Sequence, residues 1–160
     1  MKNLRQLLKS RGTQTRSSFL NLHYTDEDVR TNIGVLIEAP GCFPNYSVWN
    51  NMLLQAANLG IANAAEEVRK VLKVVRMEGS ASNKYKNCSL GMKQRIGIAM
   101  ALLGNPTLLV LDEPINGLDA DGMRIMRDVI IDVTKNYKCT VFCKLPCSSR
   151  FEFSTPSVRR

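Results

Sequence analysis

The sequence predicts an α/β fold built on a parallel sheet. Three short apolar runs, at 33–37, 107–111 and 139–142, have the composition of buried strands and are bounded by polar or turn-forming residues. Longer helical patterns separate them, and strand–helix–strand alternation is typical of parallel sheets. With 160 residues, 44% of them hydrophobic, the chain is large enough to bury a single core.

The first strand, Ile33–Ile37, leads into a loop over 38–45 that contains two prolines and a glycine, with Glu38 at its entrance. Two helices are expected next, over 48–59 and 62–77. The second has apolar residues along one stripe and charged residues elsewhere, as an amphipathic helix requires. We expect these two helices to form a separate packing unit.

The second half of the chain contains two more helices. Ser89 is expected to cap a helix that runs to about Leu103, because a Ser oxygen can accept from amides left unpaired at a helix start. The small, apolar interior of this helix predicts that it is buried. After the strand at 107–111, Asp121 is expected to cap an amphipathic helix that reaches about Tyr137.

Two carboxylates, Asp112 and Glu113, follow the apolar strand directly. Ligands bind at the carboxyl edge of parallel sheets, so this pair lies where a site is expected. Asp112 is a candidate Mg²⁺ ligand, and Glu113 is a candidate for positioning or deprotonating an attacking water in phosphoryl transfer. The alternative is an ordinary strand end with solvated acids.

The start of the Ser89 helix is a second candidate site. Unpaired N–H groups and the helix dipole favour an anion there, so Ser89 and Gly91 are candidates to hold a phosphate. The alternative is a well-capped buried helix with no ligand.

Taken together, these segments resemble the ATP-binding subunit of ABC transporters, a P-loop NTPase-like domain with a helical subdomain. Cys88–Met92 corresponds to the family signature, 108–113 to the Walker B strand and 116–119 to the D-loop. The loop at 40–45 looks like that of exporters that confer bacitracin or lantibiotic resistance.

The resemblance covers residues 31–142, with the helical subdomain over about 48–87. Residues 1–30 and 143–160 are expected to be tails that do not match the family. These tails carry most of the net charge of +8, with five basic and no acidic residues in 1–20. A basic excess confined to tails without aromatic platforms is weak support for nucleic-acid binding, and no nucleic-acid partner is expected.

The resemblance implies ATP and Mg²⁺ as cofactors and assigns roles to seven residues. Glu113 would be catalytic and Asp112 would bind the metal, while the residues facing nucleotide would be Glu38, Ser89, Gly91, Gln94 and Asp119. It also implies a head-to-tail dimer with a second ABC ATPase subunit and contact with a membrane-spanning permease. The chain would then lie in the cytoplasm on the inner face of the membrane, serving export of a peptide antibiotic or similar amphiphile.

Two family features are missing from the printed sequence. It has no Gly-x-x-x-x-Gly-Lys-Ser/Thr phosphate loop, and Cys143–Pro146 stands where the family continues toward a switch histidine. We therefore expect a catalytically incomplete fragment without the family's first strand. Strands beside the missing one, including Leu108–Leu111, are expected to have unpaired edges and to favour aggregation.

Two other functions remain open on the sequence. The chain could be a non-catalytic assembly partner that supplies its signature to a complete subunit, or a small basic nucleic-acid-binding protein.

Five cysteines without a secretory signal suit reduced thiols in a cytoplasm. A metal site at Cys139, Cys143 and Cys147 would need a helix, but this segment is predicted to be a strand followed by Pro146. The apolar runs are shorter than the roughly 20 residues that span a bilayer.

Overall fold

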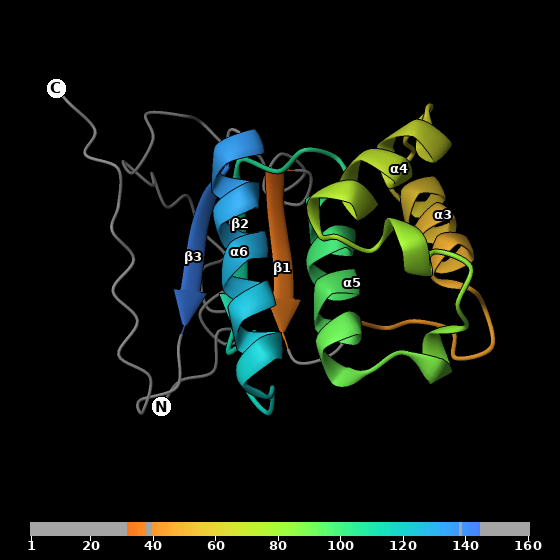
Figure 1. The fold of residues 1–160 in the computed structure, drawn as a ribbon. Coiled ribbons are helices and arrows are strands. Elements are labelled where there is room, and N and C mark those ends of the chain that lie inside the picture. Colours follow the sequence, from red (N-terminus) through yellow and green to blue (C-terminus); the bar gives the residue numbers. More distant parts are fainter. Residues whose placement is uncertain (1–31, 38–39, 138, 145–160) are drawn as a thin grey trace, which may run out of the picture. The chain divides into compact units, whose positions relative to one another are not determined.

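The computed structural model describes residues 32–37, 40–137 and 139–144 (Figure 1). Within these ranges, the strands β1 (Ile33–Ile37), β2 (Leu108–Asp112) and β3 (Thr140–Lys144) form a parallel sheet. Their order in the sheet is β1-β2-β3. The predicted α/β fold with a parallel sheet is confirmed, and each strand lies within two residues of its predicted bounds.

The central strand of the described sheet is β2, which pairs with β1 on one side and with β3 on the other. The prediction that Leu108–Leu111 has an unpaired edge is therefore wrong. The two crossovers place β1 and β3 on opposite sides of β2, so the backbone groups of β2 are bonded in both directions. Among the described strands, the outer positions belong to β1 and β3.

Four helices in the described part of the chain accompany the sheet: α3 (Val48–Asn58), α4 (Ala64–Val74), α5 (Leu90–Leu102) and α6 (Ala120–Asn136). Two short 3₁₀ turns, η1 (Glu78–Ser80) and η2 (Tyr85–Asn87), connect α4 to α5. Figure 1 shows α6 along the β2–β3 part of the sheet, α5 beside β1, and α3 and α4 beyond α5. None of the described helices is long and apolar enough to cross a membrane.

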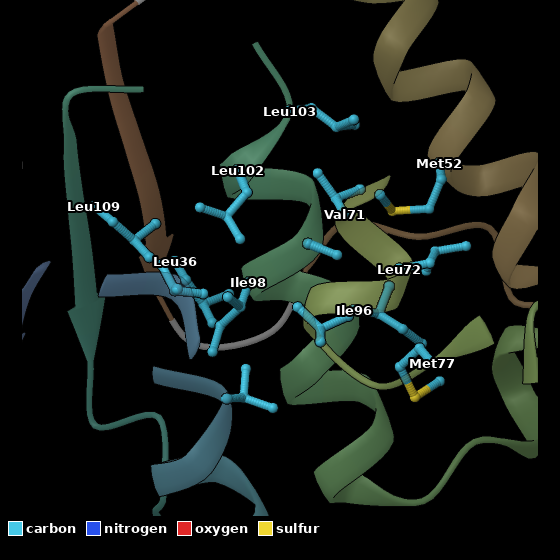
Figure 2. Packing of buried hydrophobic residues seen from close by; sticks show 14 of the residues in the cluster. Leu36, Met52, Val71, Leu72, Met77, Ile96, Ile98, Leu102, Leu103 and Leu109 are labelled. Carbon is cyan, nitrogen blue, oxygen red and sulfur yellow. The ribbon is translucent and has the colours of Figure 1, made fainter. Parts of the chain in front are cut away.

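The core is continuous from the sheet to the outer helices because α5 is apolar on several sides. Figure 2 shows Ile98 and Leu102 of α5 on the side of Leu36 and Leu109, which belong to the strands. On its other side, Ile96 lies near Leu72 of α4. The helices expected to form a separate packing unit thus share one hydrophobic core with the sheet.

The close approach of α5 to β1 depends on glycine. A Cβ added to Gly34 of β1 would collide with the backbone carbonyl oxygen of Ala101 in α5. A Cβ added to Gly97 of α5 would lie 2.6 Å from Cδ1 of Leu36 in β1. Gly34 therefore requires hydrogen in place of a side chain, whereas a methyl group at Gly97 would require the flexible Leu36 side chain to shift.

The loop between β1 and α3 is held by Asn51, a polar residue of α3 that is only 3% exposed. Its Oδ1 accepts from the Phe43 N–H at 2.7 Å, and its Nδ2 donates to the Phe43 carbonyl at 3.1 Å. Ser47 caps the same helix, since its Oγ accepts from the Asn50 N–H at 3.0 Å. These bonds satisfy backbone groups that a loop would otherwise leave unpaired.

The free energy of unfolding is expected to fall as the pH rises above about 9, because burial favours the neutral forms of two weak acids, Cys42 and Tyr85. Burial raises the pKa of Cys42 to about 11 and that of Tyr85 to about 12. Between the ordinary thiol pKa of 9.0 and about 11, the unfolded chain loses a proton that folded Cys42 retains, which favours unfolding. Urea midpoints measured in reductant at pH 8 and pH 10.5 test this. Cys42→Ala should lessen the decline, and an unchanged wild-type midpoint would contradict it.

Candidate functional site

The two predicted carboxylates lie at the carboxyl edge of the sheet, as expected. Asp112 is the last residue of β2, and Glu113 follows with a positive φ of 50°, a conformation that is uncommon for a residue other than glycine. The Glu113 N–H donates to the Lys144 carbonyl oxygen at 2.9 Å. This bond ties the turn after β2 to the end of β3.

Lys144 forms ion pairs with both carboxylates, a contact that the sequence did not reveal. Its Nζ lies 2.9 Å from Asp112 Oδ1 and 3.4 Å from Glu113 Oε1. The pairing of β2 with β3 brings the residues together, because Lys144 is the register partner of Asp112. Hydrogen bonds to Asp112 and then to Glu113 raise the pKa of the Lys144 ammonium, so it is positively charged in this arrangement.

Asn116 engages the other oxygen of the Glu113 carboxylate. Its Nδ2 donates to Glu113 Oε2 at 3.3 Å, while Oε1 lies 3.4 Å from the Lys144 ammonium. Both oxygens of the candidate catalytic base therefore have partners within the protein. The side chain of Glu113 is one-third exposed, so the ion pair between Glu113 and Lys144 is accessible to solvent at the sheet edge.

The predicted cap of α5 is confirmed. Ser89 is extended and precedes the first helical residue, and its Oγ accepts from the Met92 N–H at 3.3 Å. The side chain thus satisfies one of the amides at this helix start. The remaining amides of the first turn are the groups that would meet an anionic ligand.

The structure brings the signature stretch and the D-loop stretch together. A Cβ added to Gly91 would lie 3.6 Å from Cδ2 of Leu118, and one added to Gly117 would lie 3.2 Å from Cδ2 of Leu90. The loop that starts at Glu113 therefore runs from the carboxylate pair to the start of α5. Three of the motifs that carried the resemblance belong to one region.

The prediction that Asp121 caps α6 is wrong. Asp119 is the capping residue, and its side chain accepts from the Gly122 N–H at 2.8 Å. Asp121 lies in the first turn with its side chain exposed, 3.5 Å from the guanidinium of Arg124. The extended backbone of Asp119 allows its carboxylate to reach the helix amides, which Asp121, already helical, cannot do.

This assignment predicts different costs for two similar substitutions. Asp119→Ala should destabilise the chain by about 1 kcal/mol through loss of the cap. Asp121→Ala, which removes the same charge two residues away, should change stability by less than about 0.5 kcal/mol. Urea unfolding of both variants measures the difference, and equal costs would refute the assignment of the cap.

The other predicted site residues are less well connected. Gln94 is half-buried, and its Oε1 is buried without a hydrogen-bond partner in the described part of the chain. Glu38 lies outside the described residues. The Cys139–Cys143 segment is a strand and the loop before it, as predicted, and Cys147 lies outside the described residues.

An ammonium group occupies the carboxylate pair that was predicted to bind Mg²⁺. Within the described ranges, no group of three or more His, Cys, Asp or Glu could hold a metal ion. Magnesium binds oxygen ligands in a near-octahedral shell, and the two carboxylates here already contact an ammonium group. The role of Asp112 as a metal ligand therefore stays a prediction.

Comparison with known proteins identifies the family. The sequence profile of the ABC transporter family matches residues 4–116. The chain is 38% identical over 134 residues to the bacitracin transport ATP-binding protein BcrA of Bacillus licheniformis, covering 82% of this chain and 43% of that protein. It is also 38% identical over 112 residues to the lantibiotic transport ATP-binding protein SrtF of Streptococcus pyogenes, covering 70% of this chain and 48% of that protein.

Solved structures agree with the sequence comparisons. The chain superimposes on cbiO1 of Clostridium perfringens, part of the ABC transporter complex cbiONQ, with a TM-score of 0.68 and 25% identity over 77% of this chain and 51% of that chain. The ATP-binding cassette MJ1267 gives a TM-score of 0.62 at 19% identity, covering 74% of this chain and 53% of that chain, which supports the fold.

The chain belongs to the ABC transporter family, and its curated relatives include ATP-binding proteins of bacitracin and lantibiotic transport. It spans less than half the length of those relatives. The family match begins at residue 4, although 1–30 was expected to be a tail, and the boundaries at 30 and 142 remain predictions.

Proposed function

We propose that this chain is part of the ATP-binding subunit of an ABC transporter that exports a peptide antibiotic or a similar amphiphile. The observation that carries the proposal is the junction of the capped start of α5 with the Asn116–Asp119 loop, next to the carboxylate end of β2. The first-turn amides of α5 could bind a phosphate, and the Asn116–Asp119 loop links this helix start to the carboxylate Glu113. The similarity to bacitracin and lantibiotic transport proteins supports the substrate class.

We propose that the chain contributes one half of a nucleotide site. The amides after Ser89 would bind phosphate oxygens, and Gly91 would allow a close approach of the backbone, in a head-to-tail dimer with a second ABC ATPase subunit. The partner's phosphate loop would hold the rest of the ATP. Because Glu113 is paired with Lys144 and the printed sequence has no phosphate loop, we propose that the isolated chain is catalytically incomplete.

The remaining roles follow from the same proposal. Helices within 48–87 would contact a membrane-spanning permease, which would place the chain in the cytoplasm at the inner face of the membrane. Magnesium would accompany the ATP, as is usual for the family. The alternative is a non-catalytic assembly partner, which supplies the signature to a complete subunit and has no turnover of its own.

The test measures ATP binding and turnover by the chain alone and mixed with a full-length ABC ATPase that carries its own phosphate loop. We expect no turnover by the chain alone and increased turnover in the mixture. Gly91→Asp should abolish the increase, because a carboxylate there repels phosphate while its Cβ, 3.6 Å from Leu118, has room. Gly79→Asp is the control, since a Cβ at Gly79 meets nothing within 4 Å.

Two outcomes would overturn parts of the proposal. Turnover by the isolated chain that Glu113→Gln abolishes would show that it is catalytically complete. No change in the mixture, together with tight and steeply salt-dependent binding of DNA or RNA, would favour the nucleic-acid-binding alternative.

A further inference from the structure

We infer that Lys144 is a built-in cation that occupies the carboxylate pair in place of a divalent metal ion, so that its ammonium group inhibits metal binding at Asp112 and Glu113. The inference rests on the proposed nucleotide site, since that site is where a divalent ion would be needed. It concerns this chain's own residues and can be tested without ATP or a partner subunit.

The first support is that an ammonium group and a metal ion would need the same oxygen atoms. Lys144 Nζ lies 2.9 Å from Asp112 Oδ1, a short charge-assisted hydrogen bond, and 3.4 Å from Glu113 Oε1. A divalent ion bridging the two carboxylates would lie within a few ångströms of the ammonium. Repulsion between the two cations then weakens metal binding.

The second support is that two backbone interactions hold Lys144 beside the carboxylates. Lys144 is the register partner of Asp112 across the β2–β3 ladder, so the two side chains emerge from adjacent strands on the same face. The Lys144 carbonyl also accepts from the Glu113 N–H at 2.9 Å. Backbone pairing therefore fixes the base of the lysine beside both carboxylates, and the contact is not a chance meeting of two distant side chains.

The third support is charge compensation around the pair. Two carboxylates carry two negative charges, and Lys144 supplies one positive charge directly between them. Asn116, which binds the remaining Glu113 oxygen, is neutral and donates a hydrogen bond. A metal ion would have to compete with these hydrogen-bond donors for the carboxylate oxygens. It would also be attracted by a net charge of −1 instead of −2, because Lys144 already neutralises one carboxylate.

Lys144 is also able to leave. Its side chain is 62% exposed, whereas those of Asp112 and Glu113 are 36% and 33% exposed. Solvent-exposed ion pairs are easily exchanged for hydration. Removal of the ammonium should therefore free the carboxylates without a change of fold.

The experiment titrates the full chain with Mn²⁺ and follows free Mn²⁺ by electron paramagnetic resonance, since Mn²⁺ prefers the same oxygen ligands as Mg²⁺. Lys144→Met should tighten Mn²⁺ binding by about tenfold or more, because it removes the adjacent positive charge. Lys135→Met is the matched control, because it removes the same charge from an exposed position in the last turn of α6. Lys144→Arg, which keeps the charge, should bind as weakly as the wild type.

The double variant Lys144→Met/Asp112→Asn should lose the gain, which assigns the new binding to this pair. Equal Mn²⁺ affinity in the wild type and Lys144→Met would overturn the inference, and so would an equal gain in Lys135→Met. If Lys144→Met does not fold by circular dichroism, Lys144→Gln provides a neutral, polar replacement for the same comparison. A failure of the proposed function would instead appear in the mixed-subunit assay as an effect that is absent or insensitive to Gly91→Asp.

Discussion

Gly34→Ala is expected to destabilise the chain by about 3 kcal/mol or more, because the new methyl group would overlap a backbone carbonyl. The obstacle is the carbonyl oxygen of Ala101, a backbone atom of α5 that moves only with the helix, unlike the end of a flexible side chain. Relief requires α5 to move off β1, which would open the core at Leu36, Ile98 and Leu102. A loss of this size is a large fraction of the 5–15 kcal/mol typical of whole domains.

Urea unfolding followed by circular dichroism measures this effect. Gly41→Ala is the control, because a Cβ at Gly41 meets nothing within 4 Å, and it should change stability by less than about 0.5 kcal/mol. Gly97→Ala should fall between the two, since its Cβ would meet the flexible side chain of Leu36. A Gly34→Ala midpoint equal to that of the wild type would show that α5 and β1 tolerate greater separation than the structure describes.

The order of helices and strands could be predicted from the sequence, because the spacing of apolar residues and the positions of turn-forming residues are local signals. Ile33–Ile37 was predicted at its observed bounds, and the other strands were displaced by one or two residues. Strand order was not predictable in the same way. The error about Leu108–Leu111 arose because pairing depends on which sides of β2 the crossovers take, and no residue pattern in the strand records that.

The candidate site shows the same division between local and long-range information. The Ser89 cap was predictable because the hydroxyl and the amide that it accepts from are three residues apart. The capping residue of α6 was not predictable in this way. Asp119 and Asp121 are both suitable caps by residue type, and only the extended backbone of Asp119 distinguishes them. Lys144 was missed because its contact with Asp112 spans 32 positions and follows only from the β2–β3 register.

The second large effect concerns aggregation of the chain. We expect it to depend on the face of the sheet opposite α5 and α6. Val35, Val110 and Phe142 form one row across the three strands, and Phe142 is 63% exposed. Val35 and Ile37 are 42% and 40% exposed, whereas Leu36 between them is 3% exposed on the opposite face of β1. A contiguous apolar face on strands favours self-association. The predicted aggregation would therefore arise from this face and not from an unpaired edge of Leu108–Leu111.

Phe142→Ser should therefore slow aggregation strongly, because it removes the most exposed apolar side chain from this row while leaving the half-buried side of β3 unchanged. Light scattering during incubation near the unfolding temperature measures the rate. Phe43→Ser is the matched control, since Phe43 is 53% exposed but lies in the loop before α3, where it packs on Tyr46. If both variants slow aggregation equally, general surface hydrophobicity is the cause. If neither does, and the wild type melts as a cooperative soluble monomer, the sheet face does not govern the solution behaviour of this chain.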